Sequence, residues 1–282
     1  MTKVRSIKKI FLGEKVIEGA GVSIRRIFGH KDVTNLDPFL LLDFFNSKDP
    51  KDYVKGFPWH PHRGIETVTY LIEGEIEHED SLGNTGVIKS GDCQWMTAGN
   101  GIIHQEMPKE SPNMLGIQLW INLSSNNKMI EPKYEDINSK NIPKVEEDDG
   151  TIRVIAGEYK NTSGPGKGTS LEPIFIDVNI KRNGKFIYET EPNSTVFALI
   201  VQGEGNFDRE SKKAYSVGTG ILYNLGEKIE VNANEKGVRF LLLSGKPIKE
   251  PIAWGGPVVM NTKEELRTAF KQIDDGTFIK KV

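Results

Sequence analysis

Two short stretches of this sequence carry pairs of metal-capable side chains two residues apart. His60 and His62 form the first pair, and His104 and Glu106 form the second pair about forty residues later. Side chains two residues apart on a β-strand point to the same face of a sheet. If the two stretches are adjacent strands, four ligands converge on one point, so the sequence predicts a metal centre within residues 59–108.

The donor set narrows the choice of metal. Neutral imidazole is a common ligand for iron, copper, nickel and zinc, and three imidazoles with one carboxylate give a set of charge −1. A set without thiolate favours Fe, Mn, Co, Ni or Cu over a structural zinc, which usually has cysteine ligands. An octahedral ion held by four such ligands keeps two positions open for water, O2 or a bidentate substrate.

The remaining polar residues near these pairs have simpler interpretations. Arg63 and Glu66 form a supporting ion pair, or Glu66 lies near the metal without binding it. His78 shares a face with Ile76, which favours a hydrogen-bonded, half-buried residue over a ligand. We expect His30 to be exposed.

Short strands are the elements expected to position these side chains. Runs rich in β-branched and aromatic residues, separated by Gly, Asn, Asp and Pro, are typical of strands joined by turns. They predict strands at residues 22–28, 39–45, 66–72, 75–80 and 115–123, and again at 153–157, 174–180, 195–201, 220–225 and 238–243.

One helix is predicted near the C-terminus. Thr262 and its neighbour Asn261 provide a cap, and Leu266, Phe270 and Ile273 make an apolar stripe at helical spacing. The fold class is therefore all-β with a short C-terminal helix.

A change in composition predicts a domain boundary. Residues 124–149 are rich in Asn, Lys, Glu and Pro and end in an acidic run, which is typical of a solvated connector. We predict domains at residues 1–135 and 145–282. A weak self-similarity at an offset of 129 residues suggests two copies of one β-rich module. No histidine follows His104, so the metal site is expected in the first domain only.

Composition excludes several classes of protein. The 282-residue chain has a net charge of −2 and no basic stripe, which argues against direct nucleic-acid binding. Cys93 is the only cysteine, which suits a reducing compartment and excludes an intrachain disulfide. No apolar run has the length of a membrane span. We expect a monomeric cytoplasmic protein, with the nucleus as an alternative in a eukaryote.

Longer motifs resemble the pirin family of the cupin superfamily. They are HPHRGIETVTY at residues 60–70, GDCQWMTAG at 91–99 and GIIHQEMP at 101–108, with further matches at 36–43, 118–123 and 256–265. This resemblance implies two double-stranded β-helix (jelly-roll) barrels in tandem, with metal in the first. It also implies His60, His62, His104 and Glu106 as the ligands, so that Glu66 is not a ligand.

The resemblance also extends to the pocket. It implies that Asp43 and Phe57 line it. Trp95, Trp120 and Met96 are most simply core residues, although Trp95 and Met96 are close enough in sequence to the ligands to line a pocket. Trp59 departs from the Asp or Pro expected before HPH, which affects the shape of the pocket entrance.

The resemblance implies two functions from different classes. The first is a quercetin 2,3-dioxygenase that acts on a flavonol-like aromatic substrate with O2 at Fe(II), with Mn, Co, Ni, Cu or Zn as alternatives. Glu106 is then the catalytic residue that takes the substrate hydroxyl proton. The second is a metal- or redox-gated regulatory protein that binds a protein partner without turnover. A sugar isomerase or epimerase cupin is less favoured.

Overall fold

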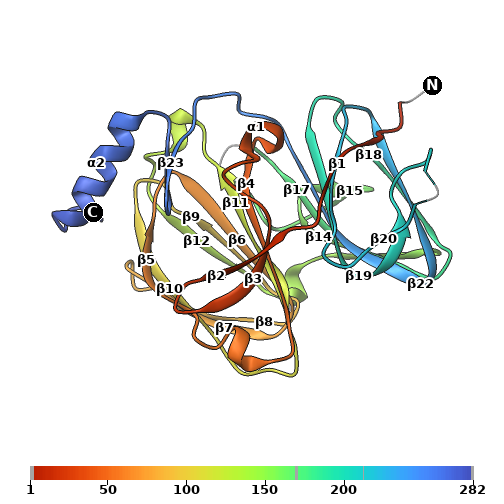
Figure 1. The fold of residues 1–282 in the computed structure, drawn as a ribbon, viewed down its shortest axis with the longest axis horizontal. Coiled ribbons are helices and arrows are strands. Elements are labelled where there is room, and N and C mark those ends of the chain that lie inside the picture. The colour runs from red at the N-terminus through yellow and green to blue at the C-terminus, as the bar shows by residue number, and fades with distance from the viewer. Residues whose placement is uncertain (1–2, 169–170, 212, 281–282) are drawn as a thin grey trace. The chain divides into compact units, whose positions relative to one another are not determined.

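Strands dominate the structure, a computed structural model that describes residues 3–168, 171–211 and 213–280 (Figure 1). The chain forms two compact units, and each unit is made of several segments that are separate in sequence. We call residues 15–139 and 248–280 the histidine unit, because it holds all five histidines, and the described parts of 3–14, 140–167 and 171–247 the second unit. The all-β prediction is confirmed.

The histidine unit is built from antiparallel sheets. A seven-stranded sheet has the order β12-β9-β6-β11-β4-β3-β2, and a four-stranded sheet has the order β5-β10-β7-β8. A two-stranded sheet, β23-β24, completes the unit. The strands are β2 (Glu14–Glu18), β3 (Val22–Phe28), β4 (Phe39–Ser47), β5 (Phe57–His62), β6 (Ile65–Glu73), β7 (Glu75–Asp80), β8 (Thr85–Lys89), β9 (Cys93–Thr97), β10 (Ile102–Pro108), β11 (Met114–Asn122), β12 (Lys133–Ile137), β23 (Ala253–Gly255) and β24 (Val258–Met260).

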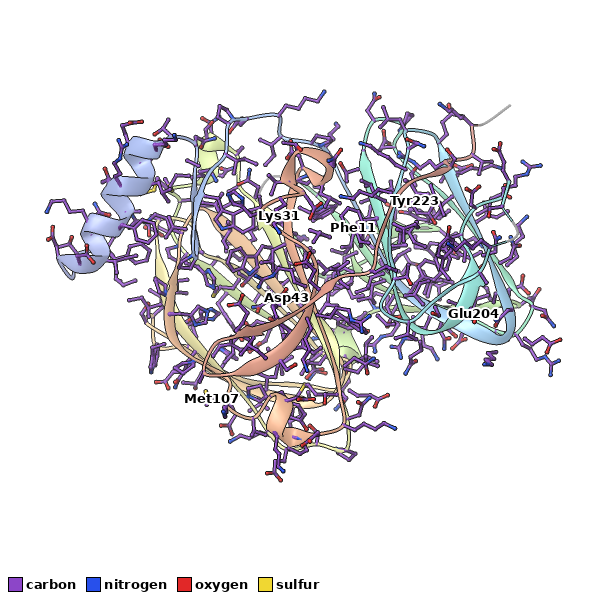
Figure 2. The ribbon with its side chains drawn as sticks, in the orientation of Figure 1. Phe11, Lys31, Asp43, Met107, Glu204 and Tyr223 are labelled. Carbon is purple, nitrogen blue, oxygen red and sulfur yellow. The ribbon has the colours of Figure 1, made fainter. Side chains whose placement is uncertain are left out.

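The second unit contains one nine-stranded sheet and a small ribbon. The main path is β1-β21-β19-β22-β17-β14-β13, while β18 pairs with β22, β20 pairs with β19, and β15 pairs with β16. Its inward side chains form a continuous apolar cluster that includes Phe207, Phe240 and Tyr223, and Figure 2 shows side chains filling the interior around Tyr223. The strands are β1 (Ile7–Phe11), β13 (Lys144–Glu147), β14 (Gly150–Ala156), β15 (Glu158–Tyr159), β16 (Thr162–Ser163), β17 (Ile174–Ile180), β18 (Lys185–Glu189), β19 (Thr195–Asn206), β20 (Tyr215–Ser216), β21 (Gly220–Tyr223) and β22 (Lys228–Gly245).

The units differ from the predicted domains at both chain ends. The N-terminal strand β1 pairs with β21 of the second unit, and residues 248–280 belong with the histidine unit. The predicted connector, 124–149, is also more ordered than its composition indicated: β12 pairs with β9, and β13 pairs with β14. Strand pairing satisfies the backbone N–H and C=O groups of these stretches, so a polar composition is compatible with strands here.

The predicted C-terminal helix is confirmed as α2 (Lys263–Asp274), which Figure 1 shows beside β23. Thr262 accepts a hydrogen bond from the Glu265 N–H, and the Glu265 side chain accepts one from the Thr262 N–H. This capping box satisfies two N–H groups that have no partner inside the helix. The described chain also has the four-residue α1 (Val33–Leu36) and short 3-10 turns at Pro50–Asp52, Ser125–Asn127 and Ser139–Asn141. None of these helices is long and apolar enough to cross a membrane.

Candidate metal centre

Two adjacent strands bring the predicted histidines together. β5 and β10 are antiparallel, with His104 opposite His60 and Ile102 opposite His62. One ligand nitrogen of each imidazole lies within 4.8 Å of the other two. The ring centroids are 4.4 Å apart for His60–His104, 4.9 Å for His60–His62 and 5.1 Å for His62–His104. Nitrogens about 2.1 Å from one ion are at most about 4.2 Å apart, so the cluster is close to ligand geometry.

Hydrogen bonds leave one nitrogen of each ring available. His60 Nδ1 lies 2.9 Å from the Pro58 carbonyl oxygen, and His62 Nδ1 lies 3.2 Å from that of Pro257. A backbone carbonyl that accepts from Nδ1–H fixes the tautomer with a free Nε2 lone pair, as is typical of metal-bound imidazole. His104 Nε2 is buried and has no hydrogen-bond partner among the residues that the structure describes. An unsatisfied buried nitrogen is costly, and a metal ion would satisfy it.

Burial keeps the His62 and His104 rings neutral. It lowers the pKa of His62 to about 3, with a further contribution from His60. Burial, reinforced by His62 and His60, also lowers the pKa of His104 well below its ordinary value. Because only the neutral ring can donate a lone pair to a metal, both imidazoles are in the ligand form at neutral pH.

Glu106 lies outside the cluster of three. Among the described residues, the group within 4.8 Å consists of the three histidines alone. The Glu106 carboxylate is buried and accepts from Thr69 Oγ1 at 3.1 Å and from Gln118 Nε2 at 3.1 Å. Its backbone pairs with Phe57 after a register shift in the β5–β10 ladder. The extra residue of this irregularity lies in β5, between Phe57 and His60, whereas β10 pairs with β7 in regular register through Glu106. Glu106 therefore keeps its two-residue spacing from His104, while its hydrogen-bonded carboxylate lies outside the group of three histidines.

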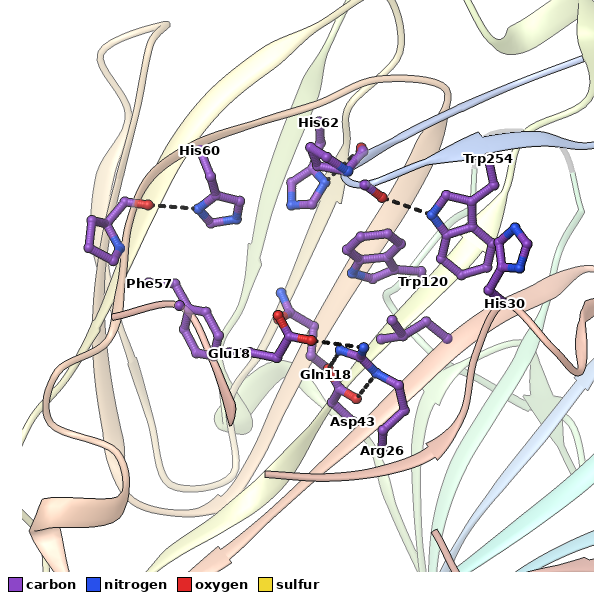
Figure 3. Close-up of a pocket in the computed structure, with 15 residues that line it drawn as sticks. Glu18, Arg26, His30, Asp43, Phe57, His60, His62, Gln118, Trp120 and Trp254 are labelled. Carbon is purple, nitrogen blue, oxygen red and sulfur yellow. Dashed lines mark hydrogen bonds and ion pairs between the residues drawn. The ribbon is translucent and has the colours of Figure 1, made fainter. Parts of the chain in front are cut away.

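A cavity of about 490 Å3 opens beside the histidines (Figure 3). His60 and His62 lie at one side of it, Trp120 and Trp254 line another wall, and Phe57 faces them in the view. The Trp120 ring is 4.9 Å from that of His62. This volume is in the range of small-molecule pockets, and aromatic walls with a few polar groups suit a flat aromatic ligand.

A charged network forms the far side of the cavity from the histidines in Figure 3. Arg26 donates to both oxygens of Asp43, at 2.9 and 2.8 Å, and its third nitrogen donates to Glu18 at 2.9 Å. Burial raises the pKa of Asp43, while the paired Arg26 opposes that rise. This network and Gln118 supply hydrogen-bonding groups to the cavity wall.

The lining of the cavity can be compared with the pocket residues expected from the sequence. Asp43 and Phe57 line it, as the resemblance implied. Trp95 and Met96 are core residues, 2% and 0% exposed. His30 is exposed as expected, but it also lines the cavity and packs against Trp254 at 5.2 Å.

Sequence reasoning missed most of the other wall residues. They are Glu18, Gly19, Arg26, Leu41, Pro58, Gln118, Trp120, Trp254, Gly256 and Pro257. Leu41, Gln118, Trp120, Gly256 and Pro257 lay within motifs that had been recognised, but no local pattern placed them beside the histidines. Trp120 was expected in the core, but it is half-buried and lines the cavity.

Two supporting residues behave differently from expectation. Arg63 donates to the carbonyls of Asn100 and Phe278 and to Gln272, which the sequence did not indicate, and the Glu66 carboxylate accepts from Thr97 Oγ1 at 2.9 Å. His78 is buried more deeply than expected, at 3% exposed, and bonds to the Tyr134 hydroxyl outside the histidine cluster.

Two family models match this chain, one in its N-terminal half and one in its C-terminal half. The model described as "Pirin" matches residues 21–121, and the model described as "Pirin C-terminal cupin domain" matches residues 175–279. Together these matches cover more than half of the chain and confirm the predicted tandem of two cupin-type domains.

Individual relatives match over nearly the full length. The chain is 39% identical to the Solanum lycopersicum protein named "Pirin-like protein" over 276 residues, 98% of this chain and 93% of that one. It is 39% identical to the Homo sapiens protein named "Pirin" over 262 residues, 92% and 88% of the two chains. A crystal structure described as quercetin 2,3-dioxygenase from Acinetobacter baumannii matches with a TM-score of 0.87 and 33% identity, over 98% of each chain.

Proposed function

Because the chain belongs to the pirin family, we propose that it is a metal-dependent dioxygenase of the quercetin 2,3-dioxygenase type. Its substrate would be a flavonol-like molecule and its co-substrate O2. The observation that carries this proposal is the cluster of three imidazoles, two of which, His60 and His62, line an aromatic cavity of about 490 Å3. The A. baumannii structure with the same fold supports the reaction class.

His60, His62 and His104 would hold one divalent ion, for which we propose Fe(II), and Glu106 would be the fourth ligand. Such an ion would supply Lewis-acid and redox chemistry toward an enol and O2. The unpartnered Nε2 of His104 and the carbonyl-oriented ring of His62 support this assignment. The Glu106 carboxylate, in a separate hydrogen-bonded position, would have to approach the cluster by rotation of its side chain.

The protein residues would bind and orient the substrate. Trp120 and Phe57 would pack on the faces of its rings, and the network around Arg26 would accept or donate hydrogen bonds to hydroxyls far from the metal. Glu106 would take the hydroxyl proton at one of its carboxylate oxygens, and Gln118 Nε2, which donates to that carboxylate, would hold it in position. Gln118 thus connects the cavity wall to the proposed base.

The test is O2 consumption by protein loaded anaerobically with Fe(II) and then mixed with quercetin and O2. We expect stoichiometric iron, O2 uptake and loss of flavonol absorbance, all abolished in His62→Ala. His30→Ala is the matched control, since it removes a cavity-wall histidine outside the cluster and should keep its iron. Glu106→Gln should lower the rate by at least roughly a hundredfold if Glu106 is the base.

The outcome also decides between the two functions. Iron-loaded wild-type protein that consumes no O2 with quercetin or related flavonols would refute the dioxygenase proposal. Partner capture that depends on His60 and His62, without turnover, would then favour the metal-gated regulatory protein.

A further inference from the structure

The C-terminal segment reaches the ligand strands directly. We call residues 253–280, comprising β23, β24 and α2 with the residues after it, the C-terminal clasp. The carbonyl of Pro257 in this clasp is the hydrogen-bond partner of His62 Nδ1, at 3.2 Å. Val258 bridges to Arg63, and the Val259 N–H donates to the Arg63 carbonyl at 3.1 Å. One ligand ring is therefore oriented by a residue almost two hundred positions away in sequence.

Arg63 hydrogen-bonds the C-terminal clasp to the segments that carry the histidine ligands. Its side chain is 2% exposed. Nε donates to the Asn100 carbonyl at 2.6 Å, one terminal nitrogen to Gln272 Oε1 at 2.7 Å, and the other to the Phe278 carbonyl at 2.9 Å. The guanidinium carbon also lies 4.1 Å from the centroid of the Phe278 ring. Arg63 follows His62 directly, and Asn100 lies just before the strand that carries His104.

An apolar cluster covers the back of the same strands. Val258, Met260, Ala269 and Phe278 of the clasp form its buried core, and Ile103 of β10 packs against it. Ile103 and His104 are consecutive on a strand, so their side chains point to opposite faces. The clasp thus supports β10 from outside while His104 projects into the cluster of histidines.

Space at the junction is tight. A Cβ at Gly64 would lie 2.0 Å from the Val259 carbonyl oxygen, and a Cβ at Gly101 would lie 3.1 Å from the Phe278 ring. Both glycines also have positive φ, at 77° and 139°. Side chains at these positions would push the clasp away, so the close approach depends on glycine.

We propose that docking of the C-terminal clasp and metal binding at the three histidines are thermodynamically coupled, with Gln272 and Phe278 as positioning residues that act through Arg63. The proposal rests on the metal centre proposed above. The clasp holds His62 and β10 in the arrangement that a metal needs. By linkage, a bound metal must stabilise the docked clasp by the same factor.

The first test changes Gln272, which lies on α2 and belongs to neither the cluster nor the cavity. Gln272→Leu removes the acceptor for Arg63, and Gln272→Glu keeps an acceptor oxygen at the same position. Co(II) affinity is measured by competition with a chelator on the full chain, together with the visible spectrum of bound Co(II). We expect Gln272→Leu to weaken Co(II) binding roughly tenfold and to alter the spectrum, and Gln272→Glu to restore both.

Arg267→Leu is the matched control on the same helix. Arg267 is exposed and its guanidinium bonds to Glu264 on the helix surface, so this variant should bind Co(II) like the wild type. Equal affinity and spectra for wild type and Gln272→Leu would overturn the proposed coupling. A loss that Gln272→Glu fails to restore would overturn the role of the Arg63 contact.

The reciprocal test uses amide hydrogen exchange of the wild-type protein with and without Co(II). We expect peptides from residues 263–278 to exchange roughly tenfold more slowly with Co(II) bound, and peptides from β17 to be unchanged. Co(II) binding with unchanged exchange in the clasp would overturn the coupling alone. Wild-type protein that takes up no Co(II) would overturn the metal centre and the coupling together.

Discussion

Lys128 offers the sharpest test of how the histidine unit is held together. Its side chain is 1% exposed. Its ammonium donates to the carbonyls of Gly64 and Val259 at 3.0 and 2.9 Å and to Asn122 Oδ1 at 2.8 Å. It therefore joins the loop after the HPH motif to β24. We expect replacement of this charge, in Lys128→Met, to change the pH dependence of stability in a defined direction.

The magnitude follows from the pKa of Lys128. Burial lowers this pKa from 10.5 to about 8. Below pH 8 the amine is charged in both the folded and unfolded states. Between pH 8 and 10.5 the unfolded chain binds the proton and the folded one does not, so the free energy of unfolding rises with pH. The wild type should gain about 1 kcal/mol by pH 9 and about 2.5 kcal/mol by pH 10 relative to a variant without the amine.

The variant also loses three hydrogen bonds. Each acceptor oxygen left without a donor costs roughly 1–3 kcal/mol, while omission of the buried charge returns about 3 kcal/mol at pH 7. At neutral pH the relief of the buried charge partly offsets the lost hydrogen bonds. At high pH the wild-type amine is neutral, so this offset disappears. Lys128→Met should therefore be destabilised only moderately at pH 7, and increasingly as the pH rises.

Urea unfolding followed by tryptophan fluorescence measures this difference. Trp59, Trp95, Trp120 and Trp254 are the only tryptophans in the chain and all lie in the histidine unit, so the signal reports on the unit that contains Lys128. Wild type and variant are compared at pH 7, 8, 9 and 10. A stability difference that is constant or shrinks with pH would refute the account of Lys128 as a charge buried at a cost.

Three further predictions follow from single sites. Cys93 is 1% exposed and burial raises its thiol pKa, so a thiol reagent at pH 8 should label it only after unfolding in urea; rapid labelling of native protein would contradict this. Thr262→Ala removes the cap of α2 and should cost about 1 kcal/mol, seen as faster amide exchange in α2 but not in β6. Trp120→Ala removes an aromatic wall of the cavity and should weaken flavonol binding roughly tenfold, measured by equilibrium dialysis, whereas unchanged affinity would place the ligand elsewhere.

The sequence determined the local features of the protein. A period-2 pattern placed β7 at residues 75–80, and a run rich in β-branched and aromatic residues placed β6, because strand pairing and burial act on neighbouring residues. The capping sequence located α2 for the same reason. The spacing of His60, His62 and His104 was sufficient to predict the cluster, since all three lie on adjacent strands that present them to one face.

Tertiary structure decided what joins segments that are distant in sequence. The Glu106 carboxylate accepts hydrogen bonds from Thr69 and Gln118 and lies outside the group of three histidines, and no local pattern signals these partners. Two partners of Arg63, Gln272 on α2 and Phe278 after it, lie more than two hundred residues further along the chain. Residue types and spacing therefore fix which side chains can bind a metal, while long-range packing fixes which of them meet and what orients them.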